Sequence, residues 1–220
     1  MAAFAYIAVA VVSYLLGSIP TGFLVAKGRG IDIRTVGSGN IGATNVFRYL
    51  GKPAGVFVLL MDALKGWAAV VGLARLVALV LYPSADAQTR EWLGVVAGIS
   101  AILGHNYTCW LHFKGGKGIA TSAGVLAALV PTALIIALGI WGVVCVATRY
   151  VSLGSIVAAF SLPFLAWLTG ASVTMIWVAG IMGALAIYKH KTNIRRLLNG
   201  TENRIGGKKP PQTGAPVSAP

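Results

Sequence analysis

The chain has 220 residues, of which 57% are hydrophobic and only 10% are charged, and its formal net charge is +13. A soluble domain carries about 25% charged residues, so this composition excludes an ordinary soluble protein. A transmembrane helix takes about 20 apolar residues, and runs of that length recur along the chain. The alternating strands of roughly ten residues that build a membrane β-barrel do not occur. The sequence therefore predicts an all-α integral membrane protein.

The first apolar segment is predicted at residues 2–26, and no charge precedes Lys27. A secretory signal peptide has basic residues ahead of a shorter apolar core, whereas here the basic residues follow the apolar segment. Cytoplasmic loops carry an excess of Lys and Arg. We therefore expect a retained transmembrane helix whose N-terminus lies outside the cell.

The further apolar segments are predicted at residues 53–82, 91–104, 119–147, 152–168 and 172–188. Six crossings would return the chain's end to the outside, yet the seven Lys and Arg from Lys189 to Lys209 belong inside. Segment 119–147 is too long for one ordinary span and holds Pro131 near its middle. Two short helices around Pro131 give seven transmembrane helices, a cytoplasmic C-terminus, and 15 of the 18 Lys and Arg inside.

We predict one polytopic membrane domain over residues 1–206 and a disordered, basic, Pro- and Gly-rich tail over residues 207–220. The predicted cytoplasmic loops are also the polar, glycine-rich ones: 27–52, 105–118, 148–152 and 189–209. A functional site is therefore expected at the cytoplasmic face.

GSGNIGATN, residues 37–45, satisfies G-x-G-x-x-G and nearly satisfies the P-loop pattern, with Ala43 in place of the lysine. Both patterns bind phosphate in nucleotide enzymes, but the strand context and the lysine are missing. Glycines that let N–H groups approach an anion, and a helix start with its positive dipole end, still suit a phosphate. We expect an anion site without a nucleotide.

A short interfacial helix is predicted next, capped by Ser38 or Asn40 and ended by Gly51. Thr44 and Arg48 are four residues apart and therefore share one face. We expect this face to present hydroxyl and guanidinium groups to an anion. An ordinary capped glycine loop is the alternative.

FKGGKG, residues 113–118, has Lys114 and Lys117 on either side of Gly115 and Gly116, directly before an apolar segment. Glycine permits positive φ and a close backbone approach, so the loop is predicted to direct N–H groups and the Lys117 charge at an anion. The alternative is a basic turn that merely follows the positive-inside rule.

HKTNIRRLLNGTENRIG, residues 190–206, is the third polar stretch. His190 and Asn193 are three residues apart and are predicted to share a face at the end of the last apolar segment. A cationic side chain there also suits the helix dipole, which is the alternative. Ser152 and Ser155 begin an apolar segment at the same membrane face.

The five acids are scattered, so no carboxylate cluster for a metal ion is expected. Asp62 and Lys65, three residues apart inside a span, are interpreted as a structural ion pair rather than a proton relay. The polar stretches then offer basic, hydroxyl and backbone donors but almost no general base beyond histidine. That inventory suits an anionic substrate and a good leaving group such as phosphate.

Together, GSGNIGATNVFR, GHNYTCWLHFKGGKGIAT and HKTNIRRLLNGTENRIG resemble the three cytoplasmic motifs of the PlsY family, the bacterial acyl-phosphate:glycerol-3-phosphate acyltransferases. The resemblance covers nearly the whole chain, to about Gly206. It implies a seven-helix enzyme of the bacterial cytoplasmic (inner) membrane with its site facing the cytoplasm. The implied reaction transfers a fatty acyl group from acyl phosphate to the 1-hydroxyl of sn-glycerol 3-phosphate. The products are lysophosphatidic acid and phosphate, in the first step of bacterial phospholipid synthesis.

The resemblance also assigns residue roles by motif position. Glycerol 3-phosphate is expected on Ser38, Arg48, Lys117 and His190. Acyl phosphate is expected on Thr44, Ser155 and the amides of Gly115 and Gly116. The catalytic candidates are Ser38, Thr44, Arg48, Lys117, Ser155 and His190. The substrate-binding candidates are Asn40, Asn45, Lys114, Gly115, Gly116, Ser152 and Asn193, and the choice between Ser152 and Ser155 stays open.

The partners expected are these two small-molecule substrates and membrane lipid, with no cofactor, metal or nucleic acid. The oligomeric state stays open, a monomer included. Because the motifs are interpreted as lacking a carboxylate base, the reaction's proton is expected to go to a substrate phosphate, with His190 as the alternative base. A membrane transporter of phosphate or organophosphate is the rival function, although no repeated halves are evident.

Overall fold

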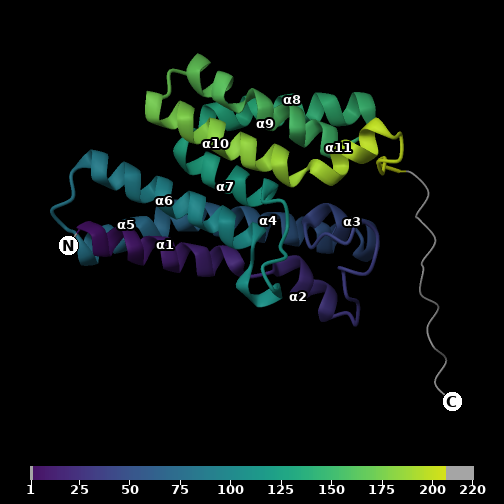
Figure 1. Cartoon of the computed structure of the whole chain (residues 1–220), viewed down its shortest axis with the longest axis horizontal. Helices are drawn as coiled ribbons and strands as arrows, with labels where there is room; N and C mark the ends of the chain where they lie inside the picture. Colours follow the sequence, from purple (N-terminus) through teal and green to yellow (C-terminus); the bar gives the residue numbers. More distant parts are fainter. Residues whose placement is uncertain (1, 207–220) are drawn as a thin grey trace.

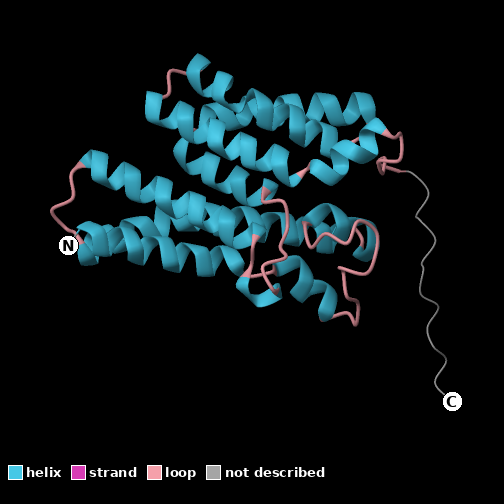
Figure 2. Ribbon diagram, in the orientation of Figure 1, coloured by secondary structure: helices cyan, strands magenta, loops and turns pink. Residues whose placement is uncertain are grey.

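The structure, a computed structural model, describes residues 2–206, and all regular structure in this range is helical (Figure 2). The helices are α1 (Ala2–Ser18), α2 (Thr21–Lys27), α3 (Ala43–Leu50), α4 (Lys52–Ala68), α5 (Ala74–Leu81), α6 (Ala87–Asn106), α7 (Ile119–Leu129), α8 (Pro131–Thr148), α9 (Val151–Leu168), α10 (Val173–Lys189) and α11 (Lys191–Leu198). A π-helical turn, η1 (Ala69–Leu73), joins α4 to α5, and a 3-10 turn, η2 (Cys109–Leu111), follows α6. The all-helical prediction is confirmed, and the predicted tail lies outside the described residues.

The helices form two layers joined by the short helix α7 (Figure 1). One layer holds α1, α4, α5 and α6, and the other holds α8, α9 and α10. Helix α7 packs mainly on α4 and also contacts α6, α8 and α10. The polar loop between α2 and α3 and the α10–α11 junction lie toward the end of the molecule away from the N-terminus (Figure 1).

Glycine allows the closest helix pairs to form. A Cβ added at Gly124 on α7 would lie 1.8 Å from the carbonyl oxygen of Ala63 on α4. A Cβ at Gly17 on α1 would lie 2.1 Å from the carbonyl oxygen of Ala101 on α6. Small residues at such contacts are typical of helices that pack in a membrane, where close backbone approach replaces the hydrophobic effect as the source of stability.

Within residues 2–206, four stretches are long and apolar enough to cross a membrane: 2–27, 52–81, 131–148 and 151–168. A fifth is present if α10 and α11, which meet at a bend of 58°, count together. Large apolar side chains face outward, with Val146 84% exposed and Phe160 76% exposed. An outer surface of this kind is stable in lipid and would be costly in water.

Two prolines divide the apolar segments. The predicted break in segment 119–147 is confirmed, because α7 ends at Leu129 and α8 begins at Pro131. The apolar segment predicted at residues 2–26 is present as one candidate span over residues 2–27. Its helix has a break that was not predicted, because α1 ends at Ser18 and Pro20 precedes α2. Proline has no N–H to donate and its ring excludes the preceding turn. The break leaves the Ile19 carbonyl available to other partners.

Candidate active site

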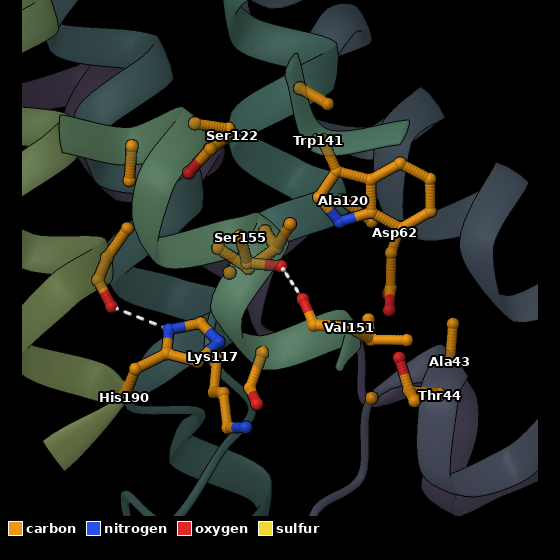
Figure 3. A pocket seen from close by; sticks show the side chains of 18 of the residues that line it. Ala43, Thr44, Asp62, Lys117, Ala120, Ser122, Trp141, Val151, Ser155 and His190 are labelled. Carbon is orange, nitrogen blue, oxygen red and sulfur yellow. Dashed lines mark hydrogen bonds between the residues drawn. The ribbon is translucent and has the colours of Figure 1, made fainter. Parts of the chain in front are cut away.

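One pocket is lined by residues of the polar loops and continues among α7, α8, α9 and α10. Figure 3 shows part of its lining. Its polar lining is Ser38, Asn40, Thr44, Asn45, Arg48, Asp62, His105, Lys117, Ser122, Ser152, Ser155, His190, Asn193, Arg196 and Glu202. Its apolar lining comes from one face of each surrounding helix and includes Leu126, Leu134, Trp141, Leu162 and Met182. The pocket therefore has a cationic, hydroxyl-rich end and a hydrocarbon end.

The three polar stretches predicted from the sequence converge on this pocket. Every predicted site residue lines it except Lys114, Gly115 and Gly116. The N–H of Gly115 donates to the Asn106 carbonyl at 3.2 Å, and that of Gly116 donates to the His105 carbonyl at 3.0 Å. The expectation that these two amides point at an anion is therefore not met in this structure.

Of the two properties for which these glycines were singled out, the structure uses the close backbone approach and not the positive φ. Gly115 and Gly116 are not in the left-handed region, whereas His112, Phe113 and Gly118 are, with φ of 53°, 59° and 77°. The diglycine is needed for space instead, since a Cβ on Gly115 would lie 2.0 Å from the His105 carbonyl oxygen. Close packing against the end of α6 explains the two glycines.

Helix α3 begins later than predicted. Gly42 is its N-cap and no side chain caps it, so the prediction of Ser38 or Asn40 as the cap is wrong. Asn40 Oδ1 instead accepts the Gly42 N–H at 2.9 Å, which closes the turn before the helix. Thr44 and Arg48 share a face as predicted, and both line the pocket.

Asn45 holds the loop that precedes α3. Its Nδ2 donates to the carbonyls of Ile33 and Val36, both at 3.1 Å, and its Oδ1 accepts the Ser38 N–H at 3.1 Å. The residue is only 2% exposed. All of its strong hydrogen-bonding groups are therefore engaged within the protein, although it also borders the pocket.

Ser152 and Ser155 have different environments at the start of α9. Ser155 Oγ donates to the Val151 carbonyl at 2.9 Å, so its lone pairs stay available toward the pocket (Figure 3). Ser152 Oγ donates to Glu202 Oε1 at 3.0 Å. Ser155 can therefore contact a ligand while it keeps its bond, whereas Ser152 is tied to the C-terminal segment.

His190 lies at the bend between α10 and α11 rather than within the last span. Its Nδ1 donates to the Ala186 carbonyl at 2.8 Å, because a carbonyl can only accept (Figure 3). The other ring nitrogen, Nε2, is then an acceptor in the neutral ring. Burial, with help from the Lys117 charge, lowers the pKa of His190 to about 4. The histidine is therefore neutral at pH 7.

Lys117 faces the same cavity from the start of α7 (Figure 3). Burial lowers its pKa to about 8, and the positive charges of Arg196 and Arg48 act in the same direction. Glu202 opposes them. Three cations thus meet one carboxylate, and a bound anion would relieve the repulsion.

Glu202 was missed by sequence reasoning, which dismissed it as a scattered acid. It is 9% exposed and accepts from Asn193 Nδ2 at 2.8 Å and Arg196 Nε at 2.6 Å, in addition to Ser152. The expectation that the motifs lack a carboxylate base overlooked this side chain, which the third motif brings into the pocket. The sequence did hold a signal for Glu202, because it lies in the same polar stretch, residues 190–206, as the predicted site residue His190.

Asn193 was predicted to share a face with His190 at the end of the last apolar segment, but it belongs to α11, beyond the 58° bend that follows α10. The segment after α11 returns to the start of α9. There Ile205 N–H donates to the Arg149 carbonyl at 2.8 Å, and the Arg149 guanidinium donates to the Ile205 carbonyl. This return brings Glu202 into the pocket. No group of three or more His, Cys, Asp or Glu suited to a metal occurs among residues 2–206.

The family model and the relatives that match this chain share one description. The family model described as glycerol-3-phosphate acyltransferase matches residues 7–200. A glycerol-3-phosphate acyltransferase of Geotalea daltonii is 48% identical over 191 residues, which cover 87% of this chain and 93% of the relative. One of Geobacter sulfurreducens is 44% identical, over 88% of this chain and 94% of the relative.

Solved structures of PlsY, described as an integral membrane glycerol 3-phosphate acyltransferase, share the fold. The glycerol 3-phosphate form has a TM-score of 0.80 and 40% identity, over 91% of this chain and 96% of that one. The lysophosphatidic acid form has a TM-score of 0.77 and 40% identity, over 93% of this chain and 95% of that one.

Proposed function

Because this chain belongs to the glycerol-3-phosphate acyltransferase family, we propose that it transfers a fatty acyl group from acyl phosphate to the 1-hydroxyl of sn-glycerol 3-phosphate. The products are lysophosphatidic acid and phosphate. One observation carries the proposal: the cationic end of the pocket continues directly into a hydrocarbon end between α7 and α10. A phosphate-bearing polar substrate and an acyl chain can therefore meet at the boundary.

Arg48, Lys117 and Arg196 bind the two phosphate groups at the cationic end. Charge-assisted hydrogen bonds to phosphate are about twice as strong as neutral ones. Arg196 already pairs with Glu202 at 2.6 Å, so a phosphate shares that guanidinium with the carboxylate. Ser38 contributes a hydroxyl donor to the lining, and Ser155 can donate to a phosphate when its hydroxyl turns away from the Val151 carbonyl. Holding both substrates in one geometry converts a bimolecular reaction into an effectively unimolecular one.

In the chemical step the glycerol hydroxyl oxygen bonds to the acyl carbonyl carbon, and the bond from that carbon to the phosphate oxygen breaks. The phosphate leaves with the electron pair of that bond. A phosphate with its second pKa at about 6 is a better proton acceptor than His190, whose pKa is lowered to about 4. The proton of the reacting hydroxyl therefore goes to phosphate, and His190 Nε2 orients glycerol 3-phosphate by accepting a hydrogen bond from its other hydroxyl group.

The membrane arrangement belongs to the same proposal. The chain crosses the bacterial inner membrane seven times, with α7 as a short crossing that is buried by its neighbours, and the pocket faces the cytoplasm. The excess of Lys and Arg in the loops at the pocket end supports this orientation. Acyl phosphate enters sideways from the bilayer. A transporter is disfavoured because the anion-binding groups gather at one end of the molecule rather than at its middle.

The direct test uses purified protein in detergent with a long-chain acyl phosphate and radiolabelled glycerol 3-phosphate. We expect labelled lysophosphatidic acid to form without a cofactor, although detergent leaves no membrane across which a substrate could be transported. Acyl-coenzyme A and acyl carrier protein serve as donor controls. Product from a thioester but none from acyl phosphate would overturn the donor assignment. Anion flux in proteoliposomes, without product in detergent, would overturn the assignment as an enzyme.

His190→Gln tests the orienting role. We expect a moderate fall in kcat and a rise in KM for glycerol 3-phosphate, because both depend on the hydroxyl contact. A collapse of kcat with unchanged KM would instead identify His190 as the general base.

A further inference from the structure

A buried cluster of three ionisable side chains, Asp62, Lys65 and His105, lies beside the pocket. Lys65 Nζ is 2.9 Å from Asp62 Oδ1, 2.9 Å from His105 Nδ1 and 3.0 Å from the Ile19 carbonyl oxygen. An ammonium has three N–H donors, so three acceptors surround it. The ion pair predicted from the sequence is therefore present, but it has a third member from α6.

The cluster fixes the tautomer of His105. A charged lysine donates and cannot accept, so His105 Nδ1 must carry a lone pair and the ring proton sits on Nε2. This is the opposite tautomer to that of His190. The cluster then holds one negative and one positive charge with a neutral ring, which makes its burial at 2–5% exposure tolerable.

The far side of the His105 ring supports the diglycine loop. A Cβ added at Gly116 would lie 2.1 Å from His105 Nε2, so the ring and the loop backbone are in direct contact. The Gly116 N–H also donates to the His105 carbonyl at 3.0 Å. Lys117, the next residue, enters the pocket. Its position therefore depends on where the His105 ring holds the loop.

We propose that Asp62, Lys65 and His105 are positioning residues that act through Gly116 to place the Lys117 ammonium in the pocket. The proposal rests on the proposed function only in that Lys117 binds the substrate phosphate. The ion pair fixes the ring, the ring fixes the loop, and the loop fixes the cation. A proton relay is not required, because every polar contact of Lys65 is explained by this support.

The test is a double-mutant cycle between His105→Asn and Gly116→Ala, read as KM for glycerol 3-phosphate and as affinity for inorganic phosphate. Asparagine retains an acceptor near the Nδ1 position but removes the part of the ring that contacts Gly116. Gly116→Ala presses on the ring from the loop side, because the added Cβ would lie 2.1 Å from His105 Nε2. Thermal denaturation in detergent checks that both variants fold before their affinities are compared. We expect each single variant to weaken phosphate affinity about tenfold, and the second substitution to add less than about twofold in the presence of the first.

Additive losses would show that the ring does not act through Gly116 and would overturn the proposal. A loss confined to thermal stability, with KM and phosphate affinity unchanged in the folded variants, would also overturn it. Phosphate affinity needs no chemistry, so this result is separable from the acyl-transfer assay. If no lysophosphatidic acid forms but the cycle is non-additive, the function fails and the positioning stands.

The tautomer gives a second readout. In ¹⁵N-histidine-labelled protein at pH 7, we expect one ring protonated on Nε2, assigned to His105, and one protonated on Nδ1, assigned to His190. His112→Asn removes the third histidine signal and serves as the control. An Nδ1–H tautomer at His105 would contradict the contact with Lys65.

Discussion

Two glycine-rich loops meet at the pocket and use glycine for different physical reasons. In the loop before α3, Gly37 and Gly39 adopt positive φ of 59° and 66°, and the turn exposes side chains of the following helix to the pocket. In the loop before α7, Gly115 and Gly116 make room for the end of α6 and donate their N–H groups to it. Similar composition therefore serves conformation in one loop and packing in the other.

The difference decides which atoms reach the substrate. The first loop is braced from within by Asn45, so Ser38, Thr44 and Arg48 face the pocket. The second loop gives up its diglycine amides to α6 and delivers one side chain, Lys117. A glycine pattern alone does not tell whether backbone donors are free for a ligand.

The largest expected effect separates the two lysines of the second loop. Lys117→Met removes a cation from the pocket, and we expect kcat/KM for glycerol 3-phosphate to fall about 100-fold or more. Lys114→Met is the matched control, because Lys114 is exposed and does not line the pocket. Its activity should stay within about twofold. Steady-state kinetics measure both variants. Equal losses of activity would refute the assignment of Lys117 as the one side chain of this loop that binds the substrate.

The next effect concerns the brace of the first loop. Asn45→Ala removes three hydrogen bonds and takes the side-chain partner from the buried Ile33 carbonyl, whereas the Val36 carbonyl keeps the Gly39 N–H. We therefore expect the free energy of unfolding to fall by about 3 kcal/mol. Asn40→Ala removes only the bond to Gly42 and should cost about 1 kcal/mol. Thermal denaturation in detergent gives the ranking. If Asn40→Ala were the more damaging change, the loop would be held by its turn rather than by Asn45.

Sequence reasoning reached the parts of this structure that depend on local patterns. Hydropathy and Pro131 predicted the division between α7 and α8, and the i, i+4 spacing placed Thr44 and Arg48 on one face. The break at Pro20 was missed although the same local rule applies to it. The other errors are tertiary. The partners of the Gly115 and Gly116 amides are carbonyls of α6, and Glu202 reaches the pocket only because the chain turns back to pair with Arg149.

A smaller effect comes from the pKa of Lys117, which burial lowers to about 8. Phosphate binding needs the protonated amine, so affinity is full below that value and is lost as the pH rises through it. We expect kcat/KM, which reports the free enzyme, to decline by up to about tenfold per pH unit above the inflection. Lys117→Arg keeps its charge at these pH values, and its profile should lose the alkaline inflection. An unchanged inflection in that variant would assign it to another group.

The smallest effect is expected at the surface of the first loop. Arg34 hydrogen-bonds Asp32 at 2.6 Å and lowers the pKa of that carboxyl to about 2. Because the folded pKa is depressed, this pair stabilises the protein above the ordinary value of 3.8 and the contribution is lost as the pH falls through about 2. Both side chains are about a third exposed or more, so water and salt screen the pair. Asp32→Asn should therefore change the free energy of unfolding by no more than about 1 kcal/mol at pH 7.

That small value would show that the loop before α3 is held from its buried side. The measurement is the same thermal denaturation used for Asn45→Ala, repeated at low and high salt. Asp32→Asn should lose its small effect at high salt, whereas the Asn45→Ala loss should persist, because neutral buried hydrogen bonds are not screened. An Asp32→Asn loss as large as that of Asn45→Ala would mean that the surface pair, and not the buried amide, orients Ser38 toward the pocket.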